Sequence, residues 1–128
     1  ESDNRSKVND MKMLKKKPSI RRPGVLTVNR MKKAVRPLFI RTGIGKALLF
    51  GSFAKGTASK KSDIDILIIK ETHRRFLDRF SEFSDLYDIF KGYAVDMLVY
   101  SPEELDRNAK RPFIKTILSE GVVLYERR

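Results

Sequence analysis

The sequence predicts an α/β fold with a small mixed sheet of three or four strands flanked by helices. Short apolar runs, typical of buried strands, alternate with longer segments in which apolar residues recur every three or four positions, as on one face of a helix. Glycines and prolines separate most of these segments. The expected strands are residues 47–50, 63–70, 93–100 and 122–125. The first expected helix begins at 27 and ends at the glycines at 43 and 45. Further helices are expected over 72–90, from 102 onward, and over 111–119.

The segment at 63–70 is predicted to be a central strand. Ile64, Ile66 and Ile68 alternate along one face, and Leu67 and Ile69 make the other face apolar beyond Asp65. A strand that is apolar on both faces is covered on both sides.

The segment at 72–90 is predicted to be one amphipathic helix. Aromatic residues step along it by four, three, four and three, which places them in one stripe facing the core. This stripe consists of Phe76, Phe80, Phe83, Tyr87 and Phe90.

The chain length of 128 residues fits one domain, which we assign to residues 27–128 after a basic tail or linker at 1–26. The net charge of +12 lies in the N-terminal third, since residues 1–46 hold 14 Lys/Arg and 3 Asp/Glu whereas residues 47–128 hold 14 and 13. Such a segment attracts nucleic acid, an acidic protein or an anionic surface, or it is a solvated extension.

Composition also excludes several classes of protein. The chain has no cysteine, which excludes disulfides and thiolate metal sites. No apolar run approaches the roughly 18–20 residues of a membrane span, so we expect no membrane partner and a cytoplasmic location.

Three carboxylates are the strongest chemical signal in the sequence. Asp63 and Asp65 open the second strand, where alternate residues point to the same face, and Asp96 interrupts the otherwise apolar third strand. Two carboxylates about 4 Å apart repel by roughly 4 kcal/mol at an effective dielectric of 20. A divalent cation would relieve this repulsion, and oxygen ligands suit Mg²⁺ or Mn²⁺.

A glycine–serine turn stands directly after the first strand. Gly51 lets the backbone approach a ligand, and Ser52 offers a hydroxyl and a backbone N–H. Lys55 adds a positive charge, and Gly56 adds a second flexible point. The turn is therefore a candidate binding site for a triphosphate beside the carboxylates.

Together these motifs resemble the signature of the DNA polymerase beta-type nucleotidyltransferase superfamily. They read Leu49-Phe50-Gly51-Ser52-Phe53-Ala54-Lys55-Gly56 and, after ten residues between Ser52 and Asp63, Ser62-Asp63-Ile64-Asp65-Ile66-Leu67. Within it the chain is most similar to the minimal nucleotidyltransferases, small proteins often paired with a HEPN-type toxin. The family commonly has Arg where Lys55 stands, and lysine binds phosphate without a bidentate fork.

The resemblance implies an enzyme that moves a nucleoside monophosphate, with AMP from ATP favoured, to a hydroxyl acceptor. It implies that Asp63, Asp65 and Asp96 hold two Mg²⁺ ions and catalyse transfer, and that Gly51 and Ser52 bind the nucleotide, with Lys55 and Gly56 beside them. For the acceptor it favours a HEPN-type toxin partner in a toxin–antitoxin pair. Transfer to RNA held by the basic N-terminal segment or to a small molecule, and a non-catalytic binding module, remain alternatives.

Overall fold

The computed structural model describes residues 26–59 and 61–128. The tail predicted at 1–26 lies outside the described residues except for Leu26, which packs against the core. The helices are α2 (Val28–Thr42), α3 (Ser52–Lys55), the 3-10 helix η2 (Phe76–Phe83), α4 (Asp85–Ile89), α5 (Pro102–Asn108) and α6 (Pro112–Glu120). The strands are β1 (Lys46–Phe50), β2 (Ile64–Ile69), β3 (Val95–Tyr100) and β4 (Val122–Glu126).

The four strands form one mixed sheet in the order β3-β2-β1-β4. Strand β1 runs antiparallel to β2 and β4, whereas β2 and β3 are parallel. The prediction of a mixed α/β sheet is confirmed, and β2 has the central position expected from its two apolar faces. Because β2 has a partner on each side, its register determines what lies next to Asp65.

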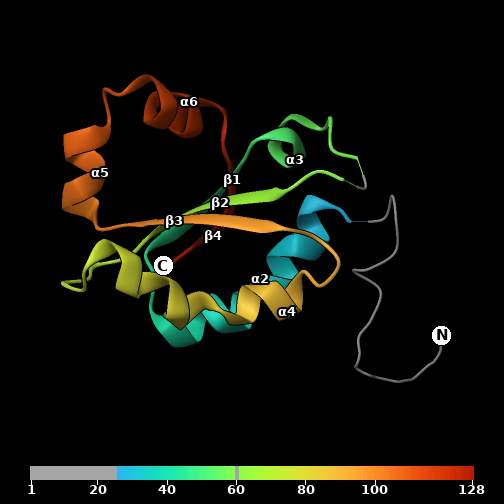
Figure 1. The fold of residues 1–128 in the computed structure, drawn as a ribbon, viewed down its shortest axis with the longest axis horizontal. Coiled ribbons are helices and arrows are strands. Elements are labelled where there is room, and N and C mark those ends of the chain that lie inside the picture. The colour runs from blue at the N-terminus through green and yellow to red at the C-terminus, as the bar shows by residue number, and fades with distance from the viewer. Residues whose placement is uncertain (1–25, 60) are drawn as a thin grey trace.

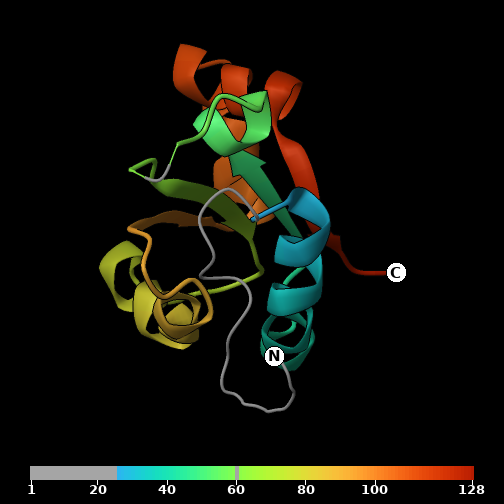
Figure 2. The same ribbon diagram turned by 90° about the vertical axis from the view of Figure 1, so that its right-hand side faces the viewer.

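Helices cover both faces of this sheet (Figures 1 and 2). Helices α2 and α4 and the 3-10 helix lie on one face, over a core that includes Phe39, Phe83 and Phe90. Helices α5 and α6 lie on the other face, where Ile114 and Ile117 pack on Leu48 and Leu67. The resulting three-layer arrangement leaves the ends of the strands open beside α3.

Helix α2 begins and ends as its sequence predicts. The Thr27 hydroxyl accepts a hydrogen bond from the Arg30 N–H, and Gly43 closes the helix in a left-handed conformation. Its buried residues recur at the predicted three- and four-residue spacing: Met31, Val35, Leu38 and Phe39. The helix continues through Pro37.

The single helix predicted for residues 72–90 is wrong. The segment is divided into η2 and α4, and Ser84 joins them through i to i+3 hydrogen bonds with Ser81 and Tyr87. A 3-10 helix has three residues per turn, so an aromatic stripe spaced for an α-helix drifts around its surface. Phe83 and Phe90 are therefore buried, whereas Phe76 and Tyr87 are exposed and Leu86 takes a core position.

Two strands also start later than predicted. Strand β2 begins at Ile64, which leaves Asp63 just before the strand. Strand β3 begins at Val95, so Asp96 is its second residue and not its middle. Both shifts place the acidic side chains nearer the open end of the sheet.

A buried arginine, Arg79, joins η2, β3 and α5 at the end of the sheet away from the acidic side chains. Arg79 is 5% exposed, and its guanidinium donates to the Val99 carbonyl oxygen at 2.9 Å. It also forms a bidentate ion pair with Glu104 of α5, with N–O distances of 2.6 and 3.0 Å. Glu104 completes a capping box with Ser101, so one carboxylate both caps α5 and binds Arg79 of η2. Hydrogen bonds from Arg79 and Ser101 lower the pKa of Glu104 to about 2.

None of the helices in residues 26–59 and 61–128 is both long enough and apolar enough to cross a membrane.

We predict that Glu104→Ala destabilises the fold by about 2–3 kcal/mol, because it leaves the buried Arg79 charge unpaired. This is slightly less than the cost of about 3–5 kcal/mol for a fully buried pair, since the Glu104 side chain is one quarter exposed. The lowered pKa means that the stabilisation is complete above pH 4.5, the ordinary value, and disappears as pH falls toward 2. Urea denaturation between pH 2 and 7 measures both effects.

Glu103→Ala is the matched control. The Glu103 side chain is 82% exposed and pairs with Arg107 at 3.3 Å within the same helix. Such a surface pair contributes about 0.5 kcal/mol. Equal losses in the two variants would contradict the role assigned to Arg79.

Candidate active site

The open end of the sheet brings together residues from three strands. Phe50, the last residue of β1, pairs with Asp65 of β2, and Asp65 pairs with Asp96 of β3. Neighbouring strands lie about 4.8 Å apart, so the two carboxylates lie side by side at the same end of the sheet. The approach of Asp96 to Asp65 therefore follows directly from the parallel register.

Gly51 lies against one of these carboxylates. Its φ of +75° and ψ of −153° are accessible mainly to glycine. A Cβ atom at this position would lie 2.3 Å from the Asp65 Oδ2 atom, which is shorter than any tolerable contact. Both the backbone conformation and the adjacent carboxylate require the absence of a side chain at residue 51.

No cationic side chain among the described residues neutralises the Asp65 and Asp96 carboxylates. Within residues 26–59 and 61–128, no Lys or Arg forms an ion pair with Asp65 or Asp96. Burial raises the pKa of Asp65, and the Asp96 and Asp63 charges and a hydrogen bond with Asp96 raise it further. The site therefore holds negative charge at a cost, which a bound cation would remove.

Asp63 contributes charge to this site but is more exposed than Asp65. It stands just before β2, two residues from Asp65. In the part of the chain that the structure describes, no three His, Cys, Asp or Glu side chains are close enough to hold a metal ion. The structure thus brings Asp65 and Asp96 together as a pair, with Asp63 beside them. This pair fits Mg²⁺, which is usually held by one or two carboxylates together with water and substrate phosphate.

Two grooves meet at Gly51 and Phe113. One, of about 550 Å³, contains Asp65 and Asp96 and has an apolar wall that includes Leu98. The other, of about 180 Å³, includes Ala54, Lys55, Thr116, Ile117 and Glu120. Phe113 is 58% exposed, and its ring meets that of Phe50 edge to face at 5.7 Å.

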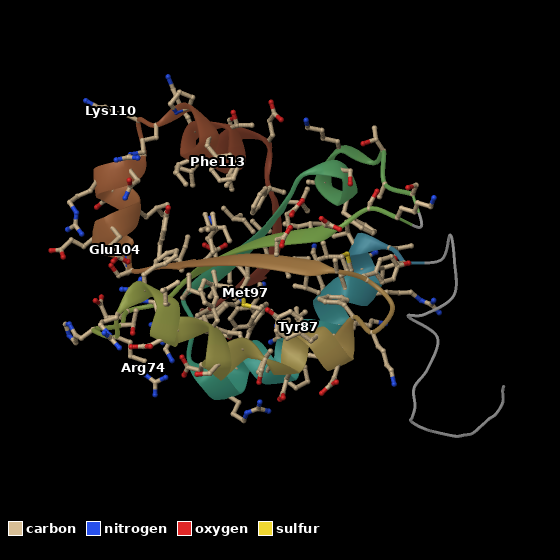
Figure 3. The ribbon with its side chains drawn as sticks, in the orientation of Figure 1. Arg74, Tyr87, Met97, Glu104, Lys110 and Phe113 are labelled. Carbon is tan, nitrogen blue, oxygen red and sulfur yellow. The ribbon has the colours of Figure 1, made fainter. Side chains whose placement is uncertain are left out.

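Figure 3 shows Phe113 on the α6 side of the sheet, above the strands, and Met97 on the opposite side. Phe113 was not predicted as a site residue, because helical periodicity places it beside core positions of α6. The only local signal is its position after Pro112, at the start of a helix.

The other predicted nucleotide-binding residues surround the glycine turn. Ser52 begins the short helix α3, and its hydroxyl makes no hydrogen bond with the described residues. Lys55 is exposed and lines the smaller groove with Gly51. Gly56 closes α3 in a left-handed conformation and faces a separate groove lined by Phe53 and Tyr93. Gly51 and Lys55 therefore share a groove, and Gly56 does not.

Known proteins resemble this chain in sequence. Residues 33–128 match the family described as "Polymerase beta, Nucleotidyltransferase". A Methanocaldococcus jannaschii protein named "putative protein adenylyltransferase" is 31% identical over 98 residues, which are 76% of this chain and 97% of the relative.

Solved structures share the fold. The structure of a "putative minimal nucleotidyltransferase" is 25% identical, with a TM-score of 0.56 over 77% of this chain and 97% of that one. A crystal structure of a toxin–antitoxin with AMP-PNP is 23% identical, with a TM-score of 0.55 over 79% of this chain and 74% of that one. The chain belongs to the polymerase beta-type nucleotidyltransferase family and is similar to minimal nucleotidyltransferases within it.

Proposed function

We propose that this nucleotidyltransferase uses Mg²⁺ to transfer AMP from ATP to a hydroxyl group of a partner protein, as the antitoxin of a toxin–antitoxin pair. The curated relative named as a protein adenylyltransferase supports AMP transfer to protein. The toxin–antitoxin structure with AMP-PNP supports a paired partner and an adenine nucleotide. A HEPN-type toxin is the partner class implied by the sequence resemblance.

The observation that carries this proposal is the Asp65–Asp96 pair held against Gly51. Adjacent strands fix the two carboxylates, and no described cation neutralises them. The glycine keeps the space beside Asp65 free of a side chain. This combination favours a site that binds a cation and a phosphate chain together.

Each residue has a role in the proposed reaction. Mg²⁺, which Asp65 and Asp96 would hold with Asp63 nearby, would neutralise phosphate charge when bound. The acceptor oxygen forms a bond to the α-phosphorus as the bond to the pyrophosphate oxygen breaks, and Asp96 accepts the hydroxyl proton. Gly51 and Ser52 contact the triphosphate through the backbone, and Lys55 contributes positive charge from the smaller groove.

We predict that label from α-³²P-ATP, but not from γ-³²P-ATP, enters the protein encoded beside this one when Mg²⁺ is present. Asp63→Asn and Asp65→Asn should each reduce labelling by at least about 100-fold, because they weaken charge stabilisation of the reacting phosphate. Autoradiography after gel electrophoresis measures the transfer. Asp88→Asn, an exposed residue of α4, is the control and should label like wild type. Transfer of the γ-label would contradict adenylylation.

We also predict that Asp65→Asn melts at a higher temperature than wild type in EDTA at pH 7. Because the pKa of Asp65 is raised, its ionised form destabilises the fold. The cost is absent below pH 3.8, where the carboxyl is protonated in both states, and it grows as pH rises through the raised pKa. Circular dichroism measures the melting temperature, and a variant less stable than wild type would show that Asp65 is not held at such a cost.

Gly51→Ala should reduce transfer by about 100-fold or more and destabilise the fold by about 1–3 kcal/mol. The added methyl group meets the Asp65 carboxylate as well as an unfavourable backbone conformation. Gly43→Ala is the control, since Gly43 has a φ of +70° but no atom within 4 Å of an added Cβ. It should lose stability with little loss of transfer in labelling and urea denaturation assays. Equal losses of transfer would show that the Asp65 contact is irrelevant.

A further inference from the structure

A second charged surface lies along α2 and β4, which run side by side (Figure 2). A groove of about 470 Å³ separates them, and we call it the α2–β4 groove. Five cations line it, three arginines and two lysines, with Glu126 as its one acidic residue. The cations are Lys32, Lys33, Arg36, Arg127 and Arg128.

The cations of this groove have no carboxylate partners among the described residues. No ion pair in residues 26–59 and 61–128 includes any of the five, and Glu126 pairs instead with Lys46 at 3.8 Å. The Arg36 guanidinium lies 5.8 Å from the centre of the Tyr125 ring, and Arg127 donates to the Gly43 carbonyl oxygen at 3.4 Å. Both arginines are thus positioned by contacts that leave their charge uncompensated.

The positive charge of the groove destabilises helix α2, which carries three of the five cations. Helix α2 contains no Asp or Glu, and Lys32 and Arg36 stand one turn apart, about 6 Å along the axis. Like charges four residues apart destabilise a helix by about 0.2–0.5 kcal/mol. The buried face of α2 offsets that cost, but packing alone does not require lysine or arginine at these exposed positions.

We propose that the α2–β4 groove binds the phosphate backbone of a nucleic acid. A polyanion with one charge on every unit matches successive cations along a helix, and arginine binds phosphate through a planar fork. An acidic peptide is less well suited, because a strand added to the exposed edge of β4 would direct only alternate side chains toward α2. The surface does not involve the carboxylate pair, so this binding is independent of the proposed transfer reaction.

Fluorescence anisotropy of the full chain with a labelled 20-nucleotide single-stranded RNA, without ATP or Mg²⁺, tests the proposal. We expect the triple variant K32A/K33A/R36A to bind about tenfold or more weakly at 100 mM KCl. The slope of log K against log salt should also fall by about 2, since each phosphate contact in single strands contributes about 0.7. The double variant R127A/R128A should show a smaller loss of the same sign, and it keeps the test valid if the triple variant unfolds. The same measurements on single-stranded DNA show whether the backbone contacts depend on the sugar.

The variant K91A/K110A/K115A is the matched control, because it removes three exposed cations elsewhere on the molecule. It should change RNA affinity by less than twofold. Equal weakening by both triple variants would overturn the proposal in favour of a net-charge effect, and so would an absence of RNA binding by wild type. Unchanged RNA binding with lost affinity for labelled polyglutamate would overturn it in favour of an acidic protein partner.

Discussion

The position of β2 in the middle of the sheet is the constraint on which the site depends. Antiparallel pairing with β1 places Phe50 opposite Asp65, and parallel pairing with β3 places Asp96 on the other side. A shift of β2 by one residue would turn Asp65 to the opposite face of the sheet. The isoleucines of β2 prevent such a shift, because they would leave the core. The same hydrophobic pattern that stabilises the sheet therefore also sets the carboxylate positions.

Much of this arrangement could be predicted from the sequence because the relevant signals are local. Alternation in β2, the Thr27 cap, the Ser101 capping box and the Gly51 turn each depend on a few neighbouring residues. Tertiary contacts account for the errors. The segment at 72–90 has a good helical pattern, but its first half is a 3-10 helix whose Arg79 pairs with Glu104, 25 residues away, a contact that no local pattern reveals. Phe113 was missed for a similar reason, since its place beside Phe50 depends on how α6 crosses the sheet.

The acidic side chains of the site and the basic side chains of the α2–β4 groove lie in two separate places. The acidic residues at the strand ends are concentrated around the half-buried Asp65, whereas the cations of α2 and of the two residues after β4 are spread along a groove. Both groups lack partners of opposite charge among the described residues, so each reduces the stability of the protein alone. Their separation matters, since a basic groove next to the carboxylates would compete with a metal ion for the same negative charge.

The double role of Glu104 has a consequence for local motion. The carboxylate that accepts hydrogen bonds from Arg79 also accepts the Ser101 N–H that starts α5. Opening of η2 therefore removes Arg79 from the carboxylate that caps α5, so the two elements are coupled through one side chain. Since α6 follows α5 after a short turn and carries Phe113, the rim of the site is connected through the backbone to a contact at the far end of the sheet.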